Sequence, residues 1–569
     1  MIQFEGGDVM TAIKKTRTLE PVVNSSDDDR RPSEVIAERQ SKELMIAFAG
    51  PIGCGISAVK ERFFESLSSA GYTVKEIKIS DYIKESIARK FIESQGSSPL
   101  DKADKYIQLQ DAGNALRLLQ GDILAEYAIK QIAEMRTSEI VTENEIDDES
   151  KRTTDYVPNR TVYLIDQLKH QDEVSLFRAV YGNLFYLFGV LSTSARRSNR
   201  LKADKVPEGR ISDLVERDRK QVESNGQQLD KALQLADFFI RNDHPNADSL
   251  KYQIERSIDL IHGINGISPT KEEYGMYAAY ASGLRSACLS RQIGASIMND
   301  DGLIIATGRN DVPKSGGGLY GPESGESDAR CVKLENGQCY NDIYKRELKD
   351  QIEGLIKARL TKVIDGLFDG ASKEHKYFLS MIKVDDLASG IAESARGDTR
   401  LSGLIEFSRS IHAEMDAIVS LALKGGASSA GATLFTYTFP CHNCARHIVA
   451  AGIKKVYYLE PYEKSLAVEL HGDAIDVDGQ RGGLGDGFEN SKRVEFLHFE
   501  GVAPRQYLNM FSPSGERKGK DGKAVKVNIR NSEKKIPEYL DNYREYELKV
   551  VKHLTDVITG LERNLSPSK

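Results

Sequence analysis

Two short motifs in the second half of the chain combine residues that can bind a metal ion with one that can move protons. They are His412-Ala413-Glu414 and Pro440-Cys441-His442-Asn443-Cys444. One imidazole and two thiolates can hold Zn²⁺ and leave its fourth position open for water, as in catalytic rather than structural zinc sites. Water held there loses a proton near neutral pH. The Glu414 carboxylate is not a ligand, so it can act as the acid and base.

Both motifs are expected at the beginnings of helices. An amphipathic helix is predicted from Ile411 to Leu423, and a second from Cys441 to Ala451. Residues three apart on a helix share one face, so both sulfur atoms of the second motif would point the same way. The positive end of a helix also favours thiolates. The sequence therefore predicts two facing helix ends that share one metal ion.

Each motif alone is a weak signal. Cys-x-x-Cys also occurs in redox pairs and in structural zinc sites, for which His442 or His447 would be the further ligand. Glu414 beside His412 favours the catalytic interpretation, because a redox pair or a structural site needs no such carboxylate. Cys331 and Cys339 are either reduced cysteines or part of a second, structural metal site.

A second group of residues near the beginning of the chain could bind phosphate. The apolar run 44–49 predicts a buried strand, and a glycine-rich loop and a helical pattern follow it. Such a loop turns backbone amides towards phosphate. The full signature requires lysine where Ile56 stands, so we predict nucleotide binding without phosphoryl transfer. The predicted nucleotide-binding residues are Gly50, Gly53, Gly55, Ile56, Ser57 and, at the end of a later strand, Asp166. A glycine turn that serves packing is the alternative.

Length and composition limit the class of protein. A chain of 569 residues, 40% hydrophobic and 29% charged, predicts two or three globular domains. A net charge of −7 argues against a dedicated nucleic-acid binder. Cysteines are few, and neither a secretory segment nor a long apolar run is present. We therefore expect a cytoplasmic protein with reduced thiols and no membrane association.

Strands that alternate with helices predict an α/β protein, with a doubly wound parallel sheet first and a three-layer αβα domain after it. The stretch 494–499 is interpreted as an edge strand of the second sheet. The predicted organisation is a disordered tail at 1–40, a P-loop domain at 41–245, a linker at 246–270, a metal-binding domain at 271–510 with an insertion at 315–405, and a mobile loop with a final helix at 511–569.

Residues 275–470 resemble the dCMP deaminase branch of the cytidine deaminase superfamily. The resemblance rests on Ser290-Arg291-Gln292-Ile293-Gly294-Ala295, Ala306-Thr307-Gly308-Arg309-Asn310, the two metal motifs and Ala451-Gly452-Ile453. It implies that His412, Cys441 and Cys444 bind one Zn²⁺. It also implies that Glu414 shuttles protons and that Asn310 contacts the deoxyribose region of the substrate.

Residues 41–245 resemble the deoxynucleoside monophosphate kinase-like P-loop fold, through the loop above and through Gln110, Gly113 and Arg117. A P-loop domain placed before a dCMP-type deaminase is similar to the bacterial antiphage dCTP/dCMP deaminases. That resemblance implies conversion of dCTP to dUTP and of dCMP to dUMP, homo-oligomers and, in some members, an inhibitory small RNA. The alternatives are a housekeeping dCMP deaminase that supplies dUMP for thymidylate synthesis, a nucleic-acid cytosine deaminase, and a nucleotide-binding signalling protein with a structural zinc.

Overall fold

The computed structural model describes residues 36–92, 101–143, 159–219, 228–243, 247–334, 337–460, 465–477, 480–481, 493–513 and 515–565. By its internal contacts the chain separates into residues 1–40 and one compact unit, Ser41–Lys569. The tail predicted at 1–40 lies outside the described residues except for 36–40.

The first sheet has six strands in the order β13-β5-β4-β1-β3-β2. Its strands are β1 (Leu44–Ala49), β2 (Thr73–Ile77), β3 (Thr161–Ile165), β4 (Phe185–Leu191), β5 (Phe238–Arg241) and β13 (Gly501–Val502). All neighbours pair in parallel except β13, which runs antiparallel to β5. Every residue of β1, β3 and β4 is buried, as the continuous apolar runs predict for strands covered on both faces.

Helices cover both faces of the first sheet. Leu44, Ile46 and Phe48 pack with α2 (Ile56–Ser69) and α10 (Ala247–Ile261). Met45 and Ala47 point the other way, as alternate residues of a strand must, towards α5 (Ile123–Glu143), α6 (Gln171–Tyr181) and α19 (Leu540–Leu565). The remaining helices here are α3 (Ile79–Ala88), α4 (Lys102–Leu119), α7 (Ser194–Ala203), α8 (Glu208–Arg219) and α9 (Leu229–Gln234). Helix α10 lies within the stretch 246–270, which was predicted as a linker.

The second sheet has seven strands in the order β11-β10-β12-β9-β8-β6-β7. They are β6 (Gly294–Met298), β7 (Ile304–Arg309), β8 (Thr433–Thr438), β9 (Lys455–Glu460), β10 (Ile475–Val477), β11 (Gln480–Arg481) and β12 (Val494–His498). Strands β8, β9, β12 and β10 are parallel, while β6, β7 and β11 join antiparallel. Strand β12 lies between β9 and β10, so the prediction of an edge strand was wrong. The short strand β10 pairs with β12 on the side away from β9. Strand β10 has too few apolar residues to be recognised as a strand in the sequence.

The second sheet also carries helices on both faces. Leu434 and Val456 pack with α15 (Ala413–Lys424) and α16 (His442–Ala450). Their chain neighbours Phe435 and Tyr457 point to the opposite face, where Phe435 packs with Met276 of α11 (Lys271–Gly283). Two shorter helices, α17 (Ala467–His471) and α18 (Tyr507–Phe511), follow later in the chain. Two sheets dominated by parallel strands and covered by helices confirm the α/β class.

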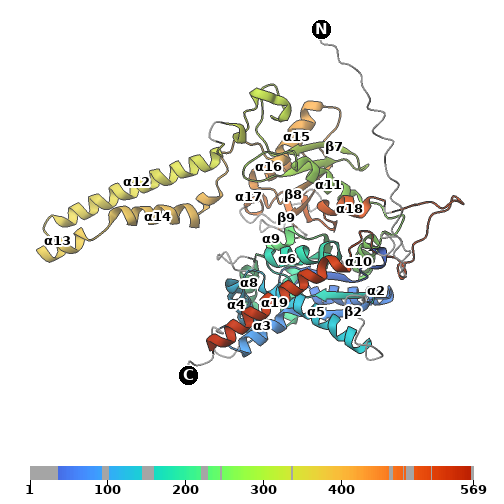
Figure 1. Cartoon of the computed structure of the whole chain (residues 1–569). Helices are drawn as coiled ribbons and strands as arrows, with labels where there is room; N and C mark the ends of the chain where they lie inside the picture. Colours follow the sequence, from blue (N-terminus) through green and yellow to red (C-terminus); the bar gives the residue numbers. More distant parts are fainter. Residues whose placement is uncertain are drawn as a thin grey trace, which may run out of the picture. The chain divides into compact units, whose positions relative to one another are not determined.

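Within the described residues, the insertion predicted at 315–405 contains three α-helices: α12 (Tyr340–Phe368), α13 (Lys373–Ser380) and α14 (Val384–Asp398). Figure 1 shows α12 and α14, in yellow, running side by side with α13 at the turn. The small residues Ala388 and Ala392 are the buried positions of α14, so the two helices approach closely there. Among the described helices, none is long and apolar enough to cross a membrane.

Candidate active site

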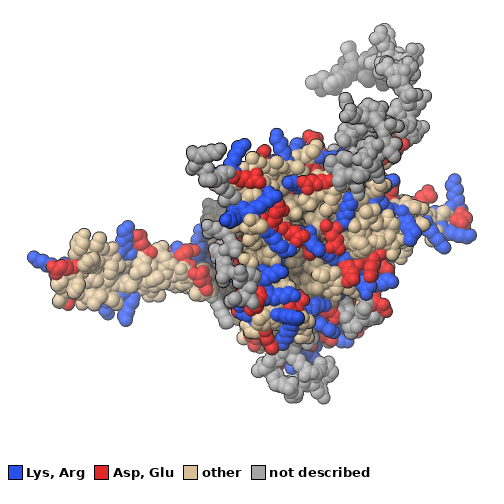
Figure 2. All heavy atoms as spheres, turned by 90° about the horizontal axis from the view of Figure 1, so that it is seen from below, with Lys and Arg blue, Asp and Glu red and all other residues tan. Residues whose placement is uncertain are grey.

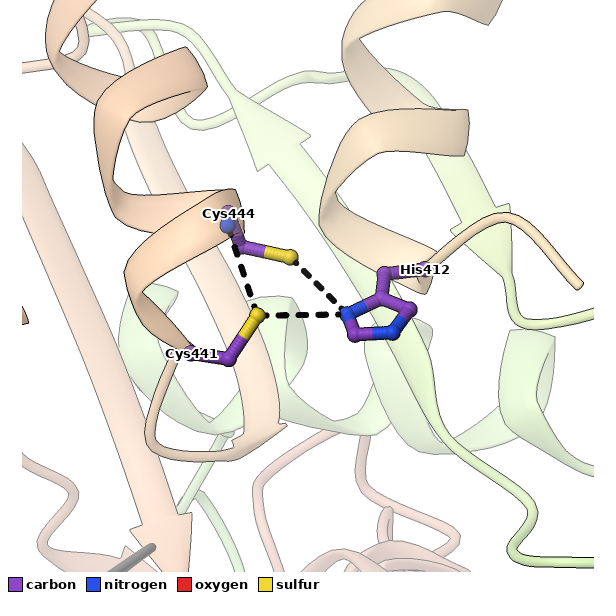
Figure 3. Close-up of side chains that lie close together, drawn as sticks. All are labelled: His412, Cys441 and Cys444. Atoms are coloured by element: carbon purple, nitrogen blue, oxygen red, sulfur yellow. Dashed lines mark hydrogen bonds between the residues drawn. The ribbon is translucent and has the colours of Figure 1, made fainter. Parts of the chain in front are cut away.

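The three predicted metal ligands meet at two helix ends, and Figure 3 shows their side chains converging. His412 is the residue before α15, and Cys441 is the residue before α16. His412 Nδ1 lies 3.4 Å from Cys441 Sγ and 3.3 Å from Cys444 Sγ. Cys441 also caps α16, because its sulfur accepts the backbone N–H of Cys444 at 3.4 Å. The local helix geometry thus places both sulfurs beside one imidazole nitrogen.

These residues fit a zinc ion. The ligand atoms of His412, Cys441 and Cys444 all lie within 4.8 Å of one another. Tetrahedral zinc with its usual bond lengths would separate neighbouring ligand atoms by about 3.5 Å, which matches the distances observed. Hydrogen bonding from Cys444, together with His412, lowers the pKa of Cys441 to about 4. The hydrogen bond with Cys441, together with burial, raises the pKa of Cys444 instead. Because a thiolate is the form that binds a metal, Cys441 is ready to bind Zn²⁺, and Cys444 would give up its proton when the ion binds.

Glu414 lies beside the ligands without completing their set. It is 5% exposed, and burial raises the pKa of its carboxyl group. Thr436 of β8 donates its hydroxyl to Glu414 Oε1 at 3.3 Å, and Glu414 Oε2 accepts from the Cys444 thiol at 3.3 Å. The carboxylate is therefore held in place next to the predicted metal, where it can exchange a proton with a bound molecule.

A cavity of about 220 Å³ opens onto these residues. Its lining comes from the two helix ends that carry the candidate metal ligands, from the segments around 290 and 310, and from the insertion. The lining residues are Cys288, Ser290, Arg291, Ile293, Asn310, Asn341, Ile405, Ser408, Ser410, His412, Ala413, Glu414, Thr438, Phe439 and Cys441. The insertion is thus part of the site wall and not only an appendage of the domain.

Asn310 lines the cavity, but its carboxamide is bonded to the backbone. Its Oδ1 accepts the N–H of Ile293 at 2.7 Å, and its Nδ2 donates to the carbonyl of Arg291 at 2.7 Å. These two bonds hold the segment 291–293 against the end of β7. The predicted contact of Asn310 with deoxyribose stays a prediction.

Several residues of the site carry no motif that identifies them in the sequence. Thr436 holds Glu414, Thr438 donates to Glu460 at 3.3 Å, and Glu460 pairs with Arg291 at the cavity wall. The alternation of Thr436 and Thr438 just before Pro440 is the one signal that could have pointed to them, because alternate residues of a strand share a face.

The predicted P-loop connects β1 to α2. Gly53 and Gly55 adopt φ angles of 79° and 82°, a region that other residues rarely occupy. Ile56 begins α2 and is buried in the core, whereas Ser57 is exposed. Asp166 follows β3, and its carboxylate lies 3.6 Å from Lys60 Nζ. Gly50 is packed against β4, where a side chain would meet the carbonyl of Val190.

Side chains from other elements occupy the surroundings of this loop. The carboxylate of Asp218, on α8, accepts the N–H of Ile52 at 2.5 Å and the ammonium of Lys169 at 2.6 Å. Lys169 also donates to the carbonyl of Gly50 at 3.3 Å. Arg200 donates to the carbonyl of Cys54 at 2.9 Å. One loop amide is therefore bound to a carboxylate of the chain itself.

Among the described residues, the group that could hold a metal ion is the triad of His412, Cys441 and Cys444, and it includes neither Cys331 nor Cys339. Cys339 Sγ lies 3.7 Å from Ser290 Oγ. Their interpretation as part of a second metal site therefore gains no support.

Comparisons with known proteins single out the same region. Residues 269–460 match the family model "Cytidine and deoxycytidylate deaminase zinc-binding region". The chain is 46% identical over 55 residues to the deoxycytidylate deaminase of Enterobacteria phage T4, and equally to ComE operon protein 2 of Bacillus subtilis (strain 168). Each match covers 10% of this chain and 28% or 29% of the relative, so the chain spans less than a third of the curated relatives it matches.

One similar solved structure is the dCMP deaminase from the cyanophage S-TIM5 in complex with dCMP and dUMP. It shares 19% identity with this chain, and the alignment covers 41% of this chain and all of the other, with a TM-score of 0.22. The zinc-binding deaminase region thus rests on the sequence matches and on the geometry of the triad.

Proposed function

We propose that this chain catalyses the hydrolytic deamination of deoxycytidine nucleotides, converting dCTP to dUTP and dCMP to dUMP with release of ammonia. The observation that carries the proposal is the buried carboxylate of Glu414 beside the triad of His412, Cys441 and Cys444 at the wall of a cavity. This is the set of groups that the zinc deaminases use, and it lies inside the region that matches the deaminase family model.

The residues divide the chemistry between them. His412, Cys441 and Cys444 would hold Zn²⁺, which when bound supplies an activated water at neutral pH. Glu414 takes one proton from the attacking water and gives it to N3 of the cytosine ring. Once the water oxygen is bonded to C4, Glu414 takes the second proton from the new C4 hydroxyl and gives it to the amino group, which leaves as ammonia while the C4–O bond becomes the carbonyl of uracil. Thr436 keeps one carboxylate oxygen in place by its hydrogen bond. Proton transfer through a positioned carboxylate typically contributes a factor of about 10² to 10⁴ in rate.

Glu414→Ala should abolish ammonia release while zinc stays bound, because Glu414 is not one of the three ligands. Purified wild-type protein and the variant would be incubated with dCTP, dCMP, CTP and a cytosine-containing oligonucleotide. Uracil products would be measured by chromatography, and zinc by elemental analysis. Cys441→Ala is the matched control, since it should lose both zinc and activity.

Retained deamination by the Glu414 variant would contradict the proposed proton transfer. Conversion of the oligonucleotide alone would favour the nucleic-acid alternative. Against that alternative, the net charge of the chain is −7. On the face shown in Figure 2, acidic and basic side chains of the described residues are interspersed.

The two-domain arrangement, which is similar to the bacterial antiphage dCTP/dCMP deaminases, supports a further proposal. Deamination would deplete deoxycytidine nucleotides during phage infection. Before infection the activity would be restrained, as by a small RNA. A homo-oligomer is expected on the same ground. Cells that express the chain should then lower phage yield and dCTP levels, and cells that express Glu414→Ala should do neither. Equal protection by both would refute the role, and a housekeeping dCMP deaminase would be the remaining interpretation.

For the first sheet we propose a nucleotide-binding role of the loop Gly50 to Ser57 without phosphoryl transfer. Two features support the second half of this proposal. Ile56 stands where kinases carry lysine, and its side chain is buried in the core. No ammonium can therefore reach a phosphate from that position.

A further inference from the structure

Asn341 is the feature of the cavity wall that the proposed chemistry leaves unexplained. It is the second residue of α12, so it belongs to the insertion and not to the sheet that carries the metal motifs. It lines the same cavity as His412 and Glu414. No motif in the sequence marks it.

One half of its carboxamide is already bonded. Asn341 Nδ2 donates to the backbone carbonyl of Leu404 at 3.2 Å. A carbonyl oxygen accepts and cannot donate, so this bond requires the amide nitrogen on that side and orients the amide oxygen away from Leu404.

The other half has no partner. Asn341 Oδ1 is buried, and within the described residues it has no hydrogen-bond donor. It is the one side-chain oxygen or nitrogen of the described cavity lining that is both buried and unbonded. Asn310, by contrast, has both ends of its carboxamide bonded to the backbone. A buried acceptor without a donor costs free energy, which a bound molecule with an O–H or N–H group would recover.

The beginning of α12 is fixed at this place by other contacts. Lys345 donates to the carbonyl of Ser402 at 2.9 Å. The rings of Tyr344 and Phe407 lie 5.5 Å apart, and the Arg409 guanidinium lies 5.3 Å from the Tyr340 ring. Asn341 is therefore held against the segment 402–409, and its oxygen does not depend on a loosely attached helix.

We infer that Asn341 is a specificity-determining residue that accepts a hydrogen bond from the sugar 3′-hydroxyl of the nucleotide. This inference rests on the proposed deamination. A deoxycytidine nucleotide offers two donors, the 4-amino group and the 3′-hydroxyl. The 4-amino group must lie at Glu414 and the metal ligands, where the C–N bond breaks. With the 4-amino group placed there, the 3′-hydroxyl is the donor that remains for Asn341 Oδ1, the unbonded half of the carboxamide.

The test compares substrates with and without the 3′-hydroxyl. The kcat/KM of dCMP and dCTP would be measured beside those of their 2′,3′-dideoxy counterparts, for the wild type and for Asn341→Ala. The wild type should prefer the hydroxylated substrates by roughly tenfold or more, the size of one buried hydrogen bond. In Asn341→Ala that preference should fall to about one, because only the hydroxylated substrates lose a contact.

Lys345→Ala is the matched control. It removes another bond between α12 and the same segment, but Lys345 does not line the cavity. It should lower all activities together and keep the preference for the 3′-hydroxyl. A wild type that deaminates its substrates while Asn341→Ala keeps the full preference would overturn the inference and leave the proposed function intact. A wild type that deaminates no nucleotide would overturn the proposed function itself.

Discussion

At the scale of single residues, local spacing places some side chains of the site, and contacts between distant segments place others. The relative placement of Cys441 and Cys444 follows from a three-residue spacing on one helix. The placement of Glu414 needs Thr436, which comes from a strand more than twenty positions later. The spacing of the two candidate cysteine ligands is thus a local property, whereas the position of the Glu414 carboxylate depends on a contact between distant segments.

A buried histidine should make stability depend on pH. His262 is 3% exposed, accepts the hydroxyl of Tyr72 at its Nε2 (2.8 Å), and donates from Nδ1 to the carbonyl of Ile258 (2.8 Å). Burial lowers the pKa of His262 to about 4, while an unfolded histidine titrates near 6.5. Between these values the unfolded state binds the extra proton, so stability falls as pH falls. The expected loss from pH 7 to pH 5 is about 2 kcal/mol.

The measurement is urea unfolding at pH 5 and pH 7. His262→Gln should show a smaller difference between the two pH values than the wild type. His375→Gln, at an exposed position of α13, should keep the wild-type difference. An equal pH dependence in all three proteins would contradict the assignment to His262.

At the scale of elements, helix α8 contacts the loop that is predicted to bind a nucleotide. Its Asp218 is 1% exposed and already uses the N–H of Ile52, one of the loop amides that a phosphate would need. Lys169, buried beside it, is neutralised by the same carboxylate. Nucleotide binding at this loop therefore requires Asp218 to give up these bonds.

Asp218→Asn should raise nucleotide affinity by about tenfold, since it removes a competing negative charge but keeps a hydrogen-bond acceptor for Lys169. Titration calorimetry with ATP would measure the affinity. The matched control is Asp213→Asn, at an exposed position of the same helix, which should change little. Unchanged binding in the Asp218 variant would refute the competition, and transfer of the γ-phosphate to a nucleoside monophosphate would refute the absence of kinase chemistry.

At the scale of the whole molecule, segments distant in the sequence complete the first sheet and its cover. Strand β13, from beyond the second sheet, pairs with β5, and Arg505 pairs with Asp237 at 2.9 Å. The final helix α19 packs on α5 and α6 through Leu540, Tyr543 and Leu554. The helix predicted near the end of the chain is therefore present, and within this chain it covers the first sheet.

A buried ionic network joins α19 to that sheet. Arg136 of α5 donates to Glu547 and to Glu43, each at 3.0 Å, and Tyr181 donates to Glu547 at 2.7 Å. Glu547→Ala should destabilise the protein by about 3 kcal/mol, because it leaves part of a buried guanidinium unpaired. The urea midpoint would measure this. Glu545→Ala, exposed on the same helix, should have almost no effect, and equal effects of the two substitutions would exclude the network as the cause.

The sequence by itself determined the parts that depend on neighbouring residues. These are the α/β class, the buried strands such as β1, and the choice of His412, Cys441 and Cys444 as candidate metal ligands, because strand burial and helix spacing follow from local patterns. Only the tertiary structure decided that the insertion brings Asn341 to the wall of the cavity and that the carboxamide of Asn310 is bonded to the backbone. It also decided that Asp218 accepts a hydrogen bond from a backbone amide of the loop. Each of these contacts joins segments distant in the chain, and their side chains meet only through packing that no local pattern encodes.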